Sequence, residues 1–178
     1  MSMLLQHIAT QLKKSRTEKG WSLDQTAKET GISKAMLGQI EREESNPTVQ
    51  TLWKIALGFH SSLSDFLPTE KQNQAVLKHQ DEALSVKVLQ AFDAVLGYEI
   101  LHITLKANSS HDSSIHEKGV IEDILPLNGS IEIQTKDQHY VANTGESIRF
   151  HADQVHRYLN HSNHDVIFYN IIHYPTSP

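Results

Sequence analysis

The stretch that decides the fold of the first half is Leu23–Arg42, LDQTAKETGISKAMLGQIER. Leu23 and Ala27 are spaced to share one face of a helix. Gly31 follows, and glycine suits the left-handed residue that ends many helices. Ser33 is a good N-cap for a second helix. The stretch therefore predicts two short helices joined by a tight turn.

Further helices are expected on both sides of this pair. Residues 3–19 have apolar side chains at helical spacing, and Gly20 ends that segment. Residues 49–59 show the same spacing, and a short fifth helix carries Leu63, Phe66 and Leu67 before Pro68. The N-caps expected for the second, third and fourth helices are Ser22, Ser33 and Thr48. Two helices joined by a glycine turn can place the second in the major groove of DNA.

The sequence pattern changes from Leu84 onward, where short β-prone runs alternate between polar and apolar residues. Seven or more such runs, separated by turn residues, indicate an antiparallel β-barrel or jelly roll. Asn128-Gly129 between two runs predicts a hairpin. We therefore expect an α+β chain with a helical domain over 1–67, a linker over 68–82 and a β domain over 83–178.

The amino-acid composition indicates the cellular compartment, and its uneven charge agrees with two domains. The chain has 178 residues, no cysteine and a net charge of −5. Residues 1–67 hold 8 Lys/Arg and 7 Asp/Glu, whereas residues 68–178 hold 8 and 14. Without cysteine there are neither disulfides nor thiolate metal sites, so a cytoplasmic protein is expected. The N-terminus does not have the pattern of a signal peptide, and no apolar run approaches the roughly 18 residues that span a membrane.

Residues 6–67 resemble the DNA-binding domain of the XRE family, whose members include the phage λ and 434 repressors. The resemblance rests on the Gly-Ile-Ser turn at 31–33, the Ile-Glu-Arg end of the second helix at 40–42, and the Asn-Pro-Thr loop at 46–48. It implies a five-helix, λ-repressor-like domain that binds a double-stranded operator. Because the local positive charge is weak, one copy should bind weakly, and a homodimer on two half-sites is expected.

The resemblance also implies which residues meet DNA. Lys34 and Gln39 could hydrogen-bond base edges, and Ala35 could contact a thymine methyl group. The residues expected to face the major groove are Ser33, Lys34, Ala35, Gly38 and Gln39. The residues expected to contact phosphates are Gln25, Ser33, Arg42, Asn46 and Thr48. For any single one of them the alternative is an ordinary solvated helix position.

The second half resembles the cupins, small jelly rolls that often hold a metal through two motifs. In the first motif His116, Glu122 and Gly129 match, but Lys118 stands where the second histidine is usual. In the second motif Gly145, His156 and Asn160 match, whereas His151 and Asp153 replace the usual Pro and Gly. The match covers roughly residues 84–175.

The residues themselves support a metal site. His116, Glu122 and His156 would supply two imidazoles and one carboxylate, a set suited to a divalent ion, zinc first and Fe, Ni or Mn as alternatives. Alternation places Glu122 among aliphatic side chains, where a carboxylate is costly unless it is paired or metal-bound. The alternative is a metal-free cupin with polar lining. His151 and Tyr158 are second-rank candidates for effector contact.

An XRE domain followed by a cupin is a recognised arrangement of bacterial transcriptional regulators, and the helical half is similar to regulators associated with sulfur utilisation. The resemblance implies a homodimer whose cupin binds a small effector, such as an amino acid or sulfur metabolite. We expect binding and not catalysis, since a sensor needs no turnover. The competing hypotheses are a metal-dependent cupin enzyme, a dioxygenase or isomerase, and a helical domain that binds protein instead of DNA.

Overall fold

The computed structural model describes residues 3–68, 77–78 and 83–175. The chain divides into two compact units, Met1–Ala75 and Val76–Pro178. Most of the expected linker, 68–82, lies outside the described residues. No helix in the described part of the chain is long and apolar enough to cross a membrane.

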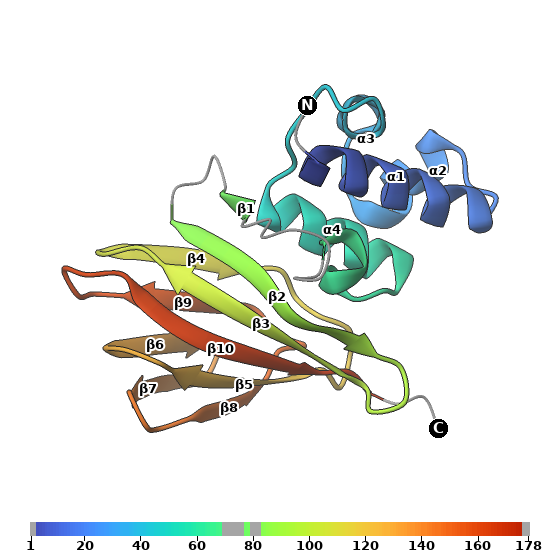
Figure 1. Ribbon diagram of the computed structural model, residues 1–178. Helices are drawn as coiled ribbons and strands as arrows, with labels where there is room; N and C mark the ends of the chain where they lie inside the picture. The colour runs from blue at the N-terminus through green and yellow to red at the C-terminus, as the bar shows by residue number, and fades with distance from the viewer. Residues whose placement is uncertain (1–2, 69–76, 79–82, 176–178) are drawn as a thin grey trace. The chain divides into compact units, whose positions relative to one another are not determined.

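The first unit contains four α-helices (Figure 1): α1 Met3–Glu18, α2 Leu23–Thr30, α3 Lys34–Glu41 and α4 Val49–Phe59. The three expected N-caps are confirmed. The hydroxyl oxygens of Ser22, Ser33 and Thr48 accept the backbone N–H groups of Gln25, Met36 and Thr51, respectively. Gly31 ends α2 in the left-handed conformation, at φ 66°, as its position in the sequence predicts.

A short 3₁₀ turn, η1 Leu63–Phe66, replaces the expected fifth α-helix. The prediction of five helices is therefore wrong, although Leu63, Phe66 and Leu67 are buried as expected. Leu67 is already extended, at φ −114° and ψ 139°. The ring of Pro68 disfavours helical dihedrals at the residue before it, so the turn cannot lengthen into an α-helix.

The helices pack around one apolar core, and α2 and α4 lie close together at Gly58. A Cβ atom added at Gly58 of α4 would lie 2.8 Å from the carbonyl oxygen of Glu29 and 2.8 Å from the Cα of Thr30. Only glycine fits at that distance from backbone atoms. The largest fully buried side chains of this unit are Ile8, Leu12, Leu37, Ile40, Leu52, Ile55, Leu63 and Phe66.

An ion pair fixes α1 to the C-terminal end of α3. Arg16 Nε donates to Glu41 Oε1 at 2.6 Å, and its second nitrogen donates to Glu41 Oε2 at 2.9 Å. Their side chains are only 17% and 10% exposed. Hydrogen bonding to Glu41, opposed by burial, raises the pKa of Arg16. The pair therefore helps to set the orientation of α3.

We expect Glu41→Gln to lower the free energy of unfolding of the helical unit by about 2 to 3 kcal/mol, because it leaves a largely buried guanidinium without its carboxylate. Urea denaturation followed by circular dichroism measures the change. Glu44→Gln is the matched control, since Glu44 pairs with Arg42 at an exposed position and exposed pairs contribute little. Equal stability of the two variants would contradict a structural role for the Arg16–Glu41 pair.

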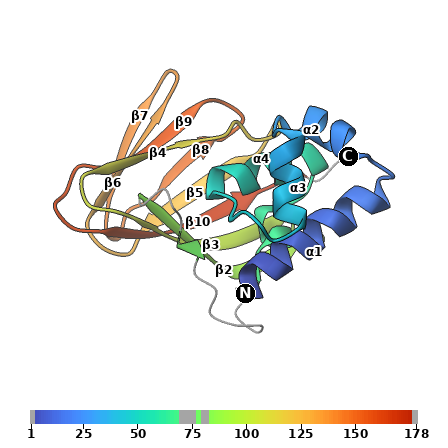
Figure 2. The same cartoon turned by 90° about the horizontal axis from the view of Figure 1, so that it is seen from above.

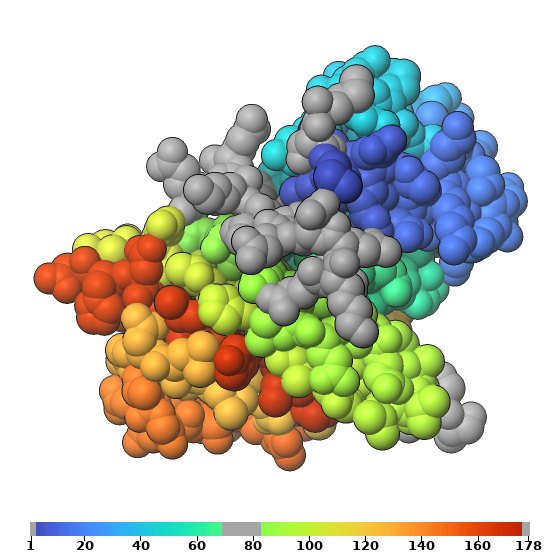
Figure 3. Space-filling view, viewed as in Figure 1, coloured from blue at the N-terminus to red at the C-terminus, as the bar shows by residue number. Residues whose placement is uncertain are grey.

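The second unit consists of two antiparallel sheets packed face to face (Figures 1 and 2). The larger sheet, in spatial order, contains β1 Leu77–Lys78, β2 Leu84–Asp93, β3 Tyr98–Leu105, β10 Val166–His173, β5 Ile121–Pro126 and β8 Ile148–His151. The smaller contains β4 Ser109–Ser113, β9 His156–Asn160, β6 Ser130–Thr135 and β7 His139–Asn143. Figure 3 shows red atoms of β10 at the surface between the green atoms of β2 and β3 and the orange-yellow atoms of β5, in agreement with the strand order of this sheet.

The strands of the described residues form two separate sheets and not a closed barrel, so the expected barrel is not confirmed. The chain changes sheet between β5 and β6, and the expected hairpin at Asn128-Gly129 is therefore wrong. The Asn128 side chain instead accepts from Ile167 N at 2.6 Å and donates to Asp165 O at 3.0 Å. These bonds join the turn to the start of β10. Between β6 and β7 the chain does form a hairpin.

Candidate DNA-reading helix and His/Glu centre

The exposed side of α3 carries most of the residues expected to face DNA. Lys34, Ala35 and Gln39 are exposed, and so is Ser33 at the N-cap. Met36 is also 40% exposed, although it was not among the residues expected to face the major groove. Its place between Lys34 and Gln39 on the same helix is the signal that could have identified it.

Gly38 does not fit the expectation that it faces the major groove, because it is buried. The side chain of Arg42 lies across it, so that a Cβ atom added at Gly38 would be 3.1 Å from an Arg42 terminal nitrogen. Leu23 of α2 is the next neighbour, at 3.8 Å. Gly38 therefore allows side chains to pack over α3 instead of presenting an atom to solvent.

Several polar groups expected to contact DNA are paired with carboxylates of the same domain. Lys34 Nζ lies 2.7 Å from Asp24 Oδ2, and both side chains are exposed. Gln25 donates to Glu29 at 2.6 Å. Arg42 donates two hydrogen bonds to Glu44, which raise the pKa of Arg42 and lower that of Glu44. Phosphates or bases would have to displace these carboxylates.

The remaining phosphate candidates lie at or near helix N-termini. Ser33 and Thr48 are N-caps, each using its hydroxyl oxygen as acceptor, while Asn46 is exposed in the preceding loop. Helix N-termini attract phosphate because backbone N–H groups point outward there. The positions of these three residues are thus compatible with contact to DNA phosphates.

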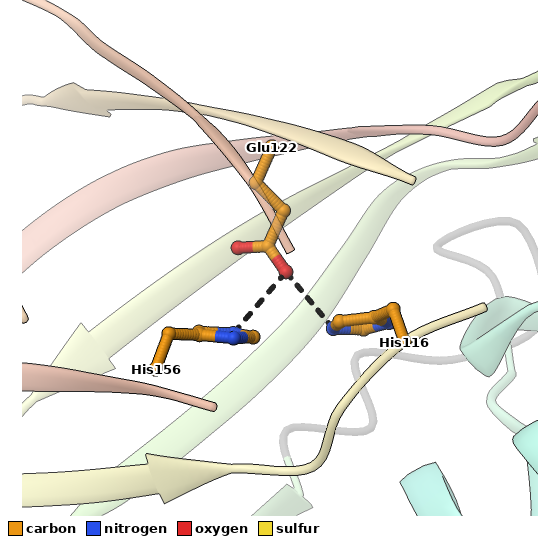
Figure 4. Close-up of side chains that lie close together, drawn as sticks. All are labelled: His116, Glu122 and His156. Carbon is orange, nitrogen blue, oxygen red and sulfur yellow. Dashed lines mark ion pairs between the residues drawn. The ribbon is translucent and has the colours of Figure 1, made fainter. Parts of the chain in front are cut away.

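In the second unit three side chains distant in sequence converge between the sheets (Figure 4). His116 comes from the loop after β4, Glu122 from β5 and His156 from β9. Glu122 Oε1 lies 2.9 Å from His116 Nε2 and 3.7 Å from His156 Nε2. One ligand atom from each residue lies within 4.8 Å of the others, and this is the one such group of three among the described residues.

Neighbouring groups orient two of these side chains. His156 Nδ1 is 2.9 Å from the carbonyl oxygen of Gln154. If Nδ1 donates there, Nε2 carries the lone pair and points at Glu122. The other carboxylate oxygen, Glu122 Oε2, accepts from the hydroxyl of Tyr158 and from Asn170 Nδ2, the latter at 2.9 Å.

The charge states follow from burial and these contacts. Burial would raise the pKa of Glu122, but contact with His116 and the charges of His156 and His116 bring it down to about 2. Burial lowers the pKa of His156, against the opposing charge of Glu122. Burial and the adjacent Glu122 raise the pKa of Tyr158 well above its usual range. The centre therefore holds an ionised carboxylate beside an imidazole that favours its neutral form.

This arrangement fits a divalent metal ion. His156 Nε2 is buried and forms no hydrogen bond within the part of the chain that the structure describes, and buried polar atoms rarely remain so without a partner. Glu122 Oε1 faces the Nε2 atoms of both imidazoles, at 2.9 and 3.7 Å. Two imidazole nitrogens and one carboxylate oxygen are a ligand set that zinc, iron and related metals accept. The rings of His116 and His156 are stacked, with centroids 5.6 Å apart and an interplanar angle of 18°.

The two effector candidates, His151 and Tyr158, lie in different surroundings. His151 is exposed at the end of β8, because it follows the buried Phe150 and alternation turns it outward; its contact with an effector stays a prediction. Tyr158 is buried, but its hydroxyl bonds Glu122. Lys118, at the departure from the cupin motif, is exposed. Asn170 was missed, although alternation with the buried Phe168 and Ile172 on β10 marks it as inward-facing.

Comparisons with known proteins agree with both halves. The helix-turn-helix model HTH_3 matches residues 12–66. The chain is 40% identical over 178 residues to the HTH-type transcriptional regulator SutR of Escherichia coli (strain K12), covering 99% of this chain and 100% of that protein. A crystal structure of an HTH_3 family transcriptional regulator from Vibrio cholerae is 42% identical, with a TM-score of 0.87 over 97% of this chain and 98% of that chain.

The strand-rich unit has a match of its own. The Cupin_2 domain of an XRE family transcriptional regulator from Enterobacter cloacae is 32% identical, with a TM-score of 0.50 over 52% of this chain and 98% of that chain. The family model covers most of the helical half, and the match to SutR runs through both halves of the chain. The chain belongs to the family of HTH-type transcriptional regulators that join an XRE-type (HTH_3) DNA-binding domain to a cupin-like domain.

Proposed function

We propose that this regulator reads its operator through Lys34, Ala35, Met36 and Gln39 of α3. The observation that carries the proposal is that these side chains are exposed together on the second helix of the helix-turn-helix. Lys34 and Gln39 can hydrogen-bond base edges, and Ala35 and Met36 can contact thymine methyl groups. Gln25, Ser33, Arg42, Asn46 and Thr48 would contact phosphates and fix the register.

We further propose that the protein acts as a homodimer. Residues 1–67 carry 8 basic and 7 acidic side chains, and Lys34 and Arg42 are each paired with a carboxylate. One domain should therefore gain little from phosphate neutralisation. Two copies on half-sites about one helical turn apart would supply the missing affinity.

The cupin-like domain is proposed to bind a small effector at the His116–Glu122–His156 centre. A divalent metal held by these residues would leave coordination positions open, and its charge would anchor an amino or carboxylate group of the effector. An amino acid or sulfur metabolite fits that chemistry. Binding would alter operator affinity only if the effector favours one dimer state over another.

Operator binding is tested with Lys34→Ala and Gln39→Ala. We expect each to lower the preference for the operator over random DNA by about tenfold, since one good base contact contributes roughly 1–3 kcal/mol of discrimination. Fluorescence anisotropy with DNA from upstream of the protein's own gene, at several salt concentrations, measures both affinity and preference.

The matched control is Lys28→Ala, which removes an exposed lysine of α2 and should leave sequence preference unchanged. Asp24→Asn should tighten binding, because it releases Lys34 from its carboxylate. If the Lys34 and Gln39 variants keep full sequence preference, α3 does not read the operator as proposed. If the wild-type protein shows no salt-dependent binding to any DNA, a protein-binding role for the helical domain is favoured instead.

A further inference from the structure

We propose that Tyr158 and Asn170 are positioning residues that hold Glu122 so that it offers a single oxygen, Oε1, to a metal ion. This inference rests on the proposed metal centre and adds two residues to it. Neither residue is one of the three that converge as ligands. Both are buried, at 4% and 1% exposure.

The contacts define the role. Tyr158 on β9 and Asn170 on β10 belong to opposite sheets, so Glu122 is held from both sides of the sandwich. Both donate to Oε2 of Glu122. Asn170 Nδ2 is also 3.4 Å from the Tyr158 hydroxyl. With two donors on Oε2, rotation of the carboxylate would break both bonds, and Oε1 remains directed at His116 and His156.

Holding Oε2 in this way limits how many coordination positions of the metal ion Glu122 can fill. A carboxylate that binds through one oxygen occupies one coordination position, whereas a carboxylate that binds through two occupies two. With the imidazoles of His116 and His156, single-oxygen binding fills three positions and leaves at least one open for an effector. Partners of this kind orient ligands and affect metal affinity strongly.

The test compares Tyr158→Phe and Asn170→Ala with wild type in the full-length protein. Tyr158→Phe removes one oxygen atom and keeps the ring that stacks on Phe168, so it should fold. We expect each variant to bind Zn²⁺ about 10- to 100-fold more weakly in competition with a chromophoric chelator. Loaded with Co²⁺, each variant should show weaker d–d absorption, since release of Oε2 allows a higher coordination number.

Tyr140→Phe is the matched control, because Tyr140 on β7 bonds Gln138 and makes no bond to the centre. It should behave as wild type in both measurements. If wild type binds the metal and the Tyr158 and Asn170 variants keep its affinity and its Co²⁺ spectrum, the positioning role is overturned and the metal site stands. If wild type binds no metal, the proposed metal site fails and this inference with it.

Discussion

Gly58→Ala is expected to destabilise the helical unit by about 3 kcal/mol or more, an effect of overpacking at a site that cannot relax. The new methyl group would lie 2.7 to 2.8 Å from the Cγ2 and Cα atoms of Thr30 and the carbonyl oxygen of Glu29. Two of these three atoms are backbone, so α2 and α4 would have to separate. Thermal and urea denaturation, followed by helical circular dichroism, measure the loss.

Gly38→Ala is the matched control for this prediction. Both glycines are buried within helices, and in both alanine gains roughly 1 kcal/mol of helix propensity. The nearest atom to a methyl group at Gly38 is the mobile end of Arg42, at 3.1 Å, which can move aside. Comparable stability of the Gly58 and Gly38 variants would show that the α2–α4 approach tolerates a side chain. In the Gly58→Ala variant, operator binding should decrease in proportion to the fraction of protein that is unfolded.

Local signals in the sequence predicted the elements of the fold well. Ser22, Ser33 and Thr48 cap helices because their side chains replace missing backbone acceptors, a contact that needs only neighbouring residues. What depends on distant partners was missed. Nothing near Gly58 in the chain shows that α2 will lie against it, and Asn128-Gly129 has the form of a hairpin turn although its strands belong to different sheets.

For the candidate site, too, sequence patterns selected some residues and missed others. Motif spacing selected His116, Glu122 and His156, and the structure brings their ligand atoms together. Alternation along β8 turns His151 outward beside the buried Phe150, a consequence of the β-prone run at 147–151 that was not applied to this residue. Which donor reaches Glu122 Oε2, in contrast, depends on the register between sheets, and no pattern within one strand reports it.

The second large effect is expected at the proposed metal centre, His116, Glu122 and His156. Purified wild-type protein should bind one equivalent of Zn²⁺, and His116→Ala and His156→Ala should each weaken binding by well over about 100-fold, since loss of an orienting partner alone costs about 10- to 100-fold. Each variant removes one of the three proposed ligands. Calorimetric titration and metal analysis of dialysed protein measure the affinity and the content. Excess Zn²⁺ should also raise the melting temperature of wild type, because a ligand that binds only the folded state stabilises it.

Histidines elsewhere provide the control, since any exposed histidine can bind metal weakly. His139 and His161 flank Glu132 on the outer side of the smaller sheet, at 2.5 and 3.2 Å from its carboxylate oxygens, and their side chains are more than half exposed. His139→Ala and His161→Ala should therefore leave the tight site intact. Full metal content in the His116 and His156 variants would place the site elsewhere. O₂ consumption by iron-loaded wild type supplied with an amino acid would favour an enzyme over a sensor.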